Sequence, residues 1–335
     1  MVTKLDSFPY TIDPQVLTRF DQRETIFGRR LWESEADFYG KNVHENAASV
    51  IAADRRGCSR LEYSRLRAAW TVYDHFRGAF SWDKLGKPDP NAKQLGKHKA
   101  TSPAVMSAQI KETARMYGAA LVGICELDRR WTYSHDVDGN PVEIPAEFKY
   151  AIVMAILMDA AAILRSPAYR AGSATGVGYS RMAFAIACLA EFIRILGYKA
   201  IPMGNDTSLS IPLAIDAGLG ELGRHGLLIT PEYGPCVRLC KVFTDLPLEP
   251  DKPIQFGVTD FCRSCDRCVG GCPPGAIRSD REPSFQVACR SNNRGILRWA
   301  VNSEKCYSFW LENGASCATC VAMCPFTRRA LDYER

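Results

Sequence analysis

Two groups of closely spaced cysteines near the C-terminal end constrain this chain more than any other feature. The first group, residues 262–272, has the spacing C-x2-C-x2-C-x3-C and is followed directly by Pro273. The second, residues 317–324, repeats the last part of that pattern before Pro325, and Cys306 lies upstream of it. Cysteines with this spacing hold iron–sulfur clusters, and the fourth cysteine of such a run ligates a different cluster from the first three. The pattern therefore predicts two clusters.

The assignment of ligands follows from the spacing typical of bacterial ferredoxins. By that logic, one [4Fe-4S] cluster, called cluster one below, is bound by Cys262, Cys265, Cys268 and Cys324. The other, called cluster two, is bound by Cys306, Cys317, Cys320 and Cys272. Two alternatives are zinc and disulfides. A zinc site would leave Cys272 and Cys324 hard to place, and disulfides rarely form at such tight spacings that end in proline.

Composition indicates an ordinary globular protein. The chain has 335 residues, of which 47% are apolar and 24% charged, so it has room for two domains. The formal net charge is +5, and each cluster with its four thiolates lowers the total by about 2. Nothing in this charge indicates a nucleic-acid surface. We expect the remaining cysteines to be reduced, because they are scattered without obvious pairing. They are Cys58, Cys125, Cys188, Cys236, Cys240 and Cys289.

The sequence does not read as a membrane or secreted protein. The best apolar stretch, residues 150–164, is interrupted by Asp159, so we expect a soluble chain. The first residues lack a secretory signal, and Arg29-Arg30 is not followed by a twin-arginine pattern. We therefore expect a cytoplasmic protein, or one peripheral to the outer face of the cytoplasmic membrane after removal of a twin-arginine signal.

Three regions follow one another along the chain. Residues 1–100 show helical spacing around residues 61–73 and end in a linker rich in proline and lysine at residues 87–99. Residues 101–254 alternate between helices and strands and predict one α/β domain. A proline-rich turn separates this domain from the cysteine region, residues 255–335. The predicted helices of the middle region are residues 107–117 and 181–196, and its predicted strands are residues 119–125, 150–158 and 199–203.

Two patterns look like cofactor motifs, and we reject both. Residues 74–78 approach the Asp-x-His-x-x-Gly signature of cobalamin ligation but lack one residue, so His75 is interpreted as structural. Residues 218–223 match the dinucleotide fingerprint G-x-G-x-x-G. That fingerprint needs a strand before it and a helix after it, whereas residues 211–217 look helical and residues 227–230 look extended. The glycines are instead expected to let the backbone approach another large, flat ligand.

A module that only relays electrons would need the cysteine region alone. The domain ahead of it suggests a redox enzyme with a second cofactor. Several segments resemble the corrinoid and iron–sulfur reductive dehalogenases over roughly residues 100–325. They are Gly178-Tyr179-Ser-Arg-Met-Ala, Pro202-Met-Gly-Asn205-Asp206, residues 217–224, residues 229–235, Arg238 and residues 241–247, followed by the two cysteine runs.

The resemblance implies a fold, two cofactors and a set of residues. The fold is α/β or α+β, with a nitroreductase-like cobalamin-binding domain followed by a ferredoxin-like domain with two [4Fe-4S] clusters. Cobalamin would be held base-off, without a protein ligand to cobalt. Tyr179 would donate a proton, with Arg238 beside it and Asn205 in the same pocket. The implied cofactor-binding residues are Met203, Gly204, Asn205, Ser208, Ser210, Gly218, Gly220, Gly223, Gly226, Leu227, Tyr233 and Pro235.

An aromatic set is predicted to form the substrate pocket. It consists of Trp131, Tyr133, Tyr307, Phe309 and Trp310, which follow the first strand or lie between cysteines. An apolar, aromatic pocket favours small chlorinated alkanes or alkenes.

The leading hypothesis is therefore an enzyme of anaerobic organohalide respiration that replaces halide by hydrogen. The expected partners are an electron donor, quinol-linked or similar to ferredoxin or flavodoxin, and a small membrane-anchor protein, while homodimerisation stays open. One alternative is an epoxyqueuosine reductase, disfavoured because its acid is an aspartate and because neither a helical-repeat tail nor a basic tRNA face is visible. The other is an electron-transfer iron–sulfur protein.

Overall fold

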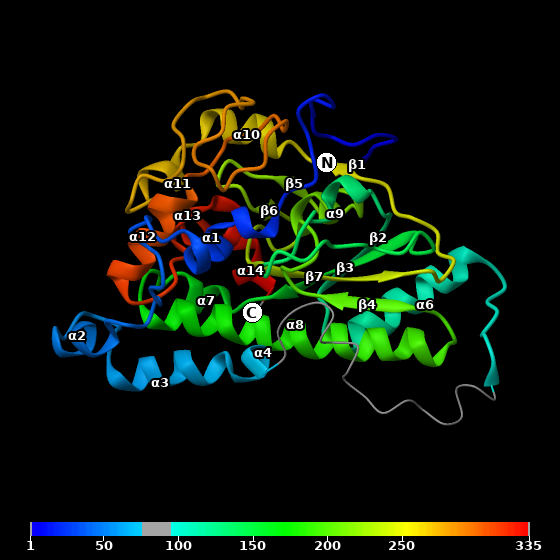
Figure 1. The fold of residues 1–335 in the computed structure, drawn as a ribbon, viewed down its shortest axis with the longest axis horizontal. Helices are drawn as coiled ribbons and strands as arrows, with labels where there is room; N and C mark the ends of the chain where they lie inside the picture. The colour runs from blue at the N-terminus through cyan, green and yellow to red at the C-terminus, as the bar shows by residue number, and fades with distance from the viewer. Residues whose placement is uncertain (1, 76–94, 334–335) are drawn as a thin grey trace.

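The chain is built around a four-stranded antiparallel sheet. The structure is a computed structural model that describes residues 2–75 and 95–333 (Figure 1); residues 76–78 of the rejected motif and 87–94 of the predicted linker lie outside these ranges. The strand order is β2-β3-β7-β4, and every neighbouring pair is antiparallel. The strands are β2 (Leu121–Glu126), β3 (Tyr150–Leu157), β4 (Ala200–Met203) and β7 (Val237–Thr244).

Both faces of the sheet are covered. Along β3, alternate side chains point to opposite faces, as the geometry of a strand requires. Ile152 and Met154 belong to the core formed with α6 (Pro103–Met116) and α8 (Tyr169–Ile195). Ala151 and Val153 belong to a second core that includes α9 (Ser210–Asp216). Figure 1 shows α8 running along one face of the sheet, with α9 on the opposite side.

The first half of α8 packs closely against the N-terminal helices. These are α3 (Arg60–Ala69) and α4 (Thr71–His75), which lie on the side of α8 away from the sheet (Figure 1). A Cβ atom at Gly172 would lie 2.6 Å from Leu66, and one at Gly176 would lie 2.7 Å from Trp70. These two glycines, one helical turn apart, therefore allow α3 to approach α8 closely.

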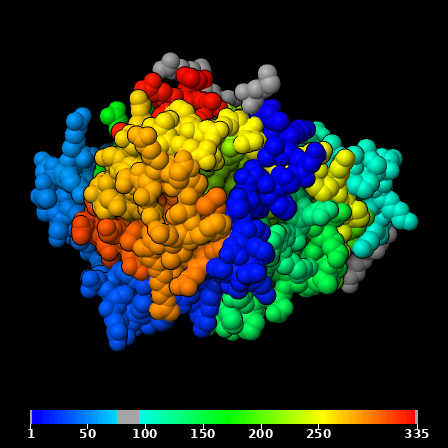
Figure 2. All heavy atoms as spheres, turned by 90° about the horizontal axis from the view of Figure 1, so that it is seen from above, coloured from blue at the N-terminus to red at the C-terminus, as the bar shows by residue number. Residues whose placement is uncertain are grey.

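The remaining N-terminal residues connect the two other regions. β1 (Thr3–Lys4) pairs with β8 (Ile254–Gln255), and Ile12 forms a bridge with Ile296. Figure 2 shows the dark blue N-terminal residues lying between the orange and green parts of the surface. The short N-terminal helices are η1 (Gln22–Glu24), α1 (Ile26–Trp32) and α2 (Ala47–Ala52).

Short elements make up the rest of the fold. η3 (Arg129–Trp131) and α7 (Ala160–Ile163) follow β2 and β3, and β5 (Glu221–Leu222) pairs with β6 (Leu228–Ile229) as a hairpin. The cysteine region contains only short helices. They are α10 (Val258–Ser264), α11 (Arg267–Gly270), α12 (Ser303–Asn313), α13 (Thr319–Met323), η4 (Pro325–Thr327) and α14 (Arg328–Tyr333).

The predicted mixed fold is confirmed in its α+β form. The strands of the middle region pair antiparallel, which is the α+β form of the predicted mixed fold. The predicted helices and strands there lie within a few residues of α6, β2, β3 and β4. Two elements differ: β7 was not predicted, and α8 begins at Tyr169 rather than at residue 181. Glycines obscured the first half of α8, since glycine has poor helix propensity.

By length and composition, α8 is apolar enough to cross a membrane. The same composition is found in core helices of soluble proteins. Half of its most apolar window is buried inside the fold, where it contacts the sheet and α3. From the sequence, residues 150–164 rather than this helix were taken as the most apolar stretch of the chain.

A buried carboxyl group ties the N-terminal segment to α9. Asp216 accepts hydrogen bonds from the Tyr10 hydroxyl at 2.6 Å and from Trp131 Nε1 at 3.3 Å. Burial raises the pKa of Asp216 to about 7. The folded state therefore holds this proton over a pH range in which the unfolded chain has released it.

We predict that stability falls as pH rises from 5 to 8, by about 2–3 kcal/mol from this group, because the native state binds the extra proton below its raised pKa. Asp216→Asn cannot ionise and should lose that part of the pH dependence. Thermal unfolding at several pH values measures it, with the exposed Asp138→Asn as control. Equal pH dependence in wild type and Asp216→Asn would contradict the assignment.

Candidate functional site

Three residues implied by the family resemblance meet at one place. Tyr179 lies half-buried in the middle of α8. Asn205, in the loop after β4, donates a hydrogen bond from Nδ2 to the Tyr179 hydroxyl at 2.6 Å. The Arg238 guanidinium, carried by β7, lies 5.2 Å from the centroid of the Tyr179 ring. The site therefore brings together a phenol, an amide donor and a cation from separate elements.

Arg238 reaches this position because Gly178 makes room for it. A Cβ atom at Gly178 would lie 3.0 Å from Arg238 Cγ. The guanidinium donates to Met158 Sδ at 3.2 Å and to Thr175 Oγ1 at 3.4 Å, and within residues 2–75 and 95–333 it forms no ion pair with a carboxylate. Its positive charge therefore stays available to an anion that develops nearby.

The loop that carries Asn205 is fixed by a buried lysine. Lys241 Nζ donates to the Gly204 carbonyl at 2.5 Å, to Ser210 Oγ at 3.0 Å and to the Asp206 carbonyl at 3.3 Å. Burial lowers the pKa of Lys241 to about 8. Asp206 accepts from the Gly204 N–H at 2.9 Å, so both ends of the loop are held and the Asn205 amide keeps one direction.

Two aromatic residues of the site were not predicted. Trp70 stacks on the Tyr179 ring with centroids 4.9 Å apart, and the Tyr73 ring lies 4.8 Å from it. Burial raises the pKa of Tyr73 well above its usual value, so its hydroxyl stays neutral. Both residues had been noticed only for their helical spacing, which places them on one side of α3 and α4. That spacing was the only signal in the sequence.

The predicted aromatic pocket is wrong as a single pocket. Trp131 is 1% exposed and hydrogen-bonds Asp216 in the α9 core. Tyr307 and Trp310 pack against Phe27 of α1. Only Tyr133 reaches the Tyr179 site, where its hydroxyl lies 3.5 Å from the Asn205 carbonyl. Residues 307–310 were expected in a loop between Cys306 and Cys317, whereas they lie on α12, which packs against α1.

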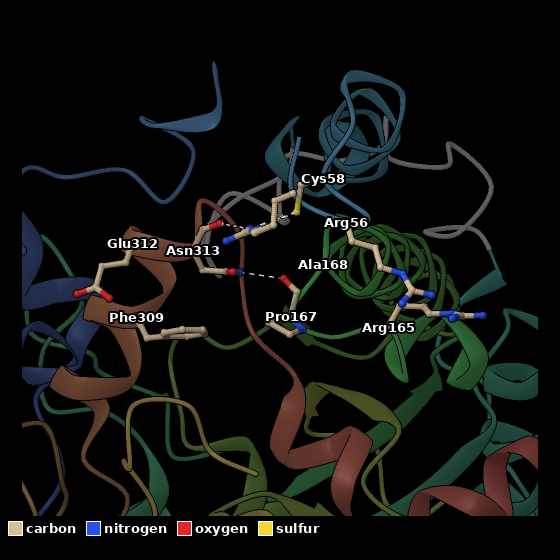
Figure 3. Close-up of a pocket in the computed structure, with 9 residues that line it drawn as sticks. Arg56, Cys58, Arg165, Pro167, Ala168, Phe309, Glu312 and Asn313 are labelled. Atoms are coloured by element: carbon tan, nitrogen blue, oxygen red, sulfur yellow. Dashed lines mark hydrogen bonds between the residues drawn. The ribbon is translucent and has the colours of Figure 1, made fainter. Parts of the chain in front are cut away.

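Phe309 lines a different pocket, of about 490 Å³, on the surface beside cluster two (Figure 3). Figure 3 shows Arg56 and Arg165 on one side of this pocket and Phe309 with Glu312 on the other. Such a charged lining does not suit a neutral chlorinated hydrocarbon.

Several glycines of the predicted cradle lie against their own chain. A Cβ atom at Gly218 would lie 2.5 Å from the Lys252 carbonyl oxygen, and one at Gly220 would lie 2.1 Å from the Ile229 carbonyl oxygen. Gly223 faces Ile229 and the His225 ring in the same way. These glycines therefore serve close packing of the chain on itself. The order α9, β5, β6 also places a helix before the glycines and a strand after them, as expected for a spurious dinucleotide fingerprint.

The other implied cofactor-binding residues mostly contact their own chain. Met203 is fully buried and accepts a hydrogen bond from Ser208 Oγ at 3.6 Å. Ser210 binds Lys241, and Tyr233 packs in a core with Leu227 at its edge. Pro235 is buried and Gly226 has a positive φ of 75° in the β5–β6 turn. Asn205 is the exposed member of the set.

The cysteines form the two predicted groups. Cys262, Cys265, Cys268 and Cys324 line one cavity together with Phe261 and Phe326. The thiols that act electrostatically on Cys306 are those of Cys317 and Cys272, and Cys320 interacts with the same group.

Buried thiols need a compensating charge before they can ionise. Burial raises the pKa of Cys324 to about 11 and that of Cys306 to about 12, so each thiolate requires a nearby cation. In the part of the chain that the structure describes, no three His, Cys, Asp or Glu side chains converge on a single ion. The thiolates of a cubane instead bind separate irons around it. Both groups therefore fit [4Fe-4S] clusters.

Comparisons with known proteins show which family this chain resembles. Residues 132–248 match the family model described as reductive dehalogenase subunit, and residues 261–327 match that of a 4Fe-4S dicluster domain. A tetrachloroethene reductive dehalogenase of Desulfitobacterium hafniense is 38% identical over 294 residues, covering 75% of this chain and 53% of the relative. Another, of Sulfurospirillum multivorans, is 39% identical over 259 residues, covering 68% and 51%.

The fold has a solved counterpart. It is a reductive dehalogenase whose structure is described as suggesting a mechanism for B12-dependent dehalogenation. The two structures superpose with a TM-score of 0.73 at 23% identity, over 99% of this chain and 46% of that chain. At this identity the likeness shows the fold. The chain spans about half the length of the curated relatives it matches.

We predict that Cys306→Ser loses cluster two and keeps cluster one, because Cys306 is the ligand outside the tight runs. Iron content after anaerobic reconstitution should fall from about eight toward about four per chain. The matched control is Cys289→Ser, since Cys289 hydrogen-bonds Ser303 near α12 without belonging to either group. Full iron content in Cys306→Ser would show that another thiol is the ligand.

Proposed function

Because the chain belongs to the reductive dehalogenase family, we propose that it replaces a halide of a small organohalide by hydrogen, with Tyr179 supplying the proton. The observation that carries the proposal is the hydrogen bond from Asn205 Nδ2 to the Tyr179 hydroxyl beside Arg238. Asn205 is the donor in that bond, so the phenolic proton is free for the substrate. The amide and the guanidinium both stabilise the phenolate left behind.

The surroundings of Tyr179 favour a small neutral substrate. Trp70 and Tyr73 form an aromatic wall on the phenol, and Arg238 is the cation that the geometry places beside it. A phenolic substrate would need a further cation for its own oxygen. Chlorinated alkenes or alkanes therefore fit best, and the curated relatives above are named for tetrachloroethene.

We propose cobalamin as the second cofactor. When bound, it supplies the reducing cobalt centre that breaks the carbon–halogen bond. The residues that would face it are Asn205, which is exposed, and Tyr179 and Arg238, which are half-buried.

A base-off cobalamin without a protein ligand is consistent with three of the histidines. His44 Nδ1 lies 3.2 Å from the Gly314 carbonyl, His135 Nδ1 lies 3.7 Å from Asp21, and His225 lines the cluster-one cavity. Each therefore has a role elsewhere in the fold.

Both clusters would pass electrons from an external donor to this site, and we propose a quinol-linked or flavodoxin-like donor. The alternative as an epoxyqueuosine reductase would require an aspartate as the acid. Asp206, beside Asn205, accepts hydrogen bonds from the Gly204 N–H and the Thr207 hydroxyl. A pure electron carrier would hold iron and no cobalt after reconstitution with both.

We predict that Tyr179→Phe lowers the rate of halide release by about 10²-fold or more, since general acid catalysis contributes about 10²–10⁴-fold. Cobalt and iron content should stay at wild-type levels, because the phenyl ring keeps its packing against Trp70. Halide release from chlorinated alkenes, alkanes and phenols with a chemical reductant measures this. Near-normal turnover in Tyr179→Phe would show that another group donates the proton.

A second prediction concerns Trp70. Trp70→Ala should change the relative rates of halide release among substrates of different size, because it removes the indole ring that stacks on the Tyr179 ring. The control is Trp32→Ala, which changes a tryptophan that is 42% exposed on α1. If both variants keep the wild-type order of substrates, Trp70 does not shape the pocket.

A further inference from the structure

His225 lies in the cavity of cluster one and has a nitrogen without a partner. The residue follows β5 and is 5% exposed. It lines the same cavity as Cys262, Cys265, Cys268 and Cys324. Among the described residues, its Nε2 has no hydrogen-bond partner. A buried polar group without a hydrogen-bond partner destabilises the fold, so this nitrogen requires a partner that the described protein atoms do not provide.

The other ring nitrogen determines where the proton is. His225 Nδ1 accepts a hydrogen bond from the Leu227 N–H at 3.2 Å. An acceptor nitrogen carries no proton, so the ring must be the neutral tautomer with its proton on Nε2. Nε2, the nitrogen without a partner, therefore carries the proton. It is a donor that points away from the backbone of its own turn.

Among the described side chains that line this cavity, the hydrogen-bond acceptors are the cysteine sulfur atoms. Apart from His225 and the four cysteines, its lining consists of apolar side chains and a proline. They are Ile229, Phe261, Pro325 and Phe326. A donor enclosed by this lining can reach only a cysteine sulfur or an inorganic sulfide of the cluster.

The hairpin β5–β6 holds His225 in place from both sides. A Cβ atom at Gly223 would lie 2.8 Å from His225 Cε1, so a glycine there leaves room for the ring. Arg224, next in sequence, is buried and donates to the Cys262 carbonyl at 2.6 Å and 3.0 Å. The turn is thus attached to the cluster-one loop at the residue that precedes His225.

We propose that His225 donates a hydrogen bond from Nε2 to a sulfur atom of cluster one and raises the reduction potential of that cluster. Reduction adds negative charge to the cluster, and a donor aimed at sulfur stabilises the more negative state. The potential of an iron–sulfur cluster depends on such bonds as well as on burial and net charge. The proposal concerns the cluster alone and holds whether or not the chain dehalogenates.

The test is a potentiometric titration of the reconstituted protein followed by EPR. His225→Phe keeps a ring and removes the donor, so one of the two midpoint potentials should become more negative and the other should not move. A bond of ordinary strength changes the ratio of reduced to oxidised cluster about tenfold, or about 59 mV for one electron. His225→Gln retains a side-chain N–H and should recover part of the shift.

Iron content and a labelled spectrum complete the experiment. Both variants should keep about eight irons per chain, because His225 is not a ligand. Wild type carrying ¹⁵N-histidine should show nitrogen coupling to one reduced cluster, and His225→Phe should show none. The proposal is overturned if His225→Phe keeps both midpoints with full iron content, or if the labelled wild type shows no coupling. If His225→Phe fails to assemble cluster one, the presence or absence of nitrogen coupling in the spectrum of the labelled wild type alone decides whether the proposal holds.

Discussion

The close contact between α3 and the glycine-rich half of α8 is the constraint on which the site depends. Side chains at Gly172 and Gly176 would overlap Leu66 and Trp70, so α3 can lie where it does only because those side chains are absent. This approach puts Trp70 on the Tyr179 ring. Two residues beyond Gly176 on α8, Gly178 leaves room for Arg238, whose guanidinium lies 5.2 Å from the centroid of the Tyr179 ring. The glycines lower the helix propensity of this stretch, and the packing of three elements around the Tyr179 hydroxyl compensates for that loss.

The glycines after α9 serve the second half of the molecule. Glu221 accepts the N–H groups of Phe256 and Val258 where α10 begins, at 2.5 Å and 3.3 Å. Arg224 binds the Cys262 carbonyl within the same helix. The hairpin that looked like a nucleotide cradle in the sequence is therefore the support that joins the sheet domain to cluster one.

Local chemistry could be predicted from the sequence, and arrangement could not. Cysteine spacing predicted both ligand groups because a run with this spacing gives its fourth cysteine to the other cluster. Tyr179, Asn205 and Arg238 were found through motifs, although they come from three elements. The prediction of an aromatic substrate pocket failed, since an aromatic residue near a cysteine is equally suited to a hydrophobic core. Trp131 and Tyr307 both lie in such cores. β7 was missed because Arg238 and Lys241 interrupt its apolar pattern, each for a purpose that only the folded sheet reveals.

The central claim is that the Tyr179 hydroxyl gives its proton to the substrate, and one substitution tests it without removing the hydroxyl. Replacing Tyr179 with 3-fluorotyrosine keeps the ring and its packing while making the phenol more acidic. The decisive measurement is the rate of halide release by the reconstituted protein, compared with wild type and with Tyr179→Phe. The account predicts that 3-fluorotyrosine keeps the halide release that Tyr179→Phe loses, because its hydroxyl can still give a proton to the substrate. Equal rates of halide release in the two substituted proteins would contradict it.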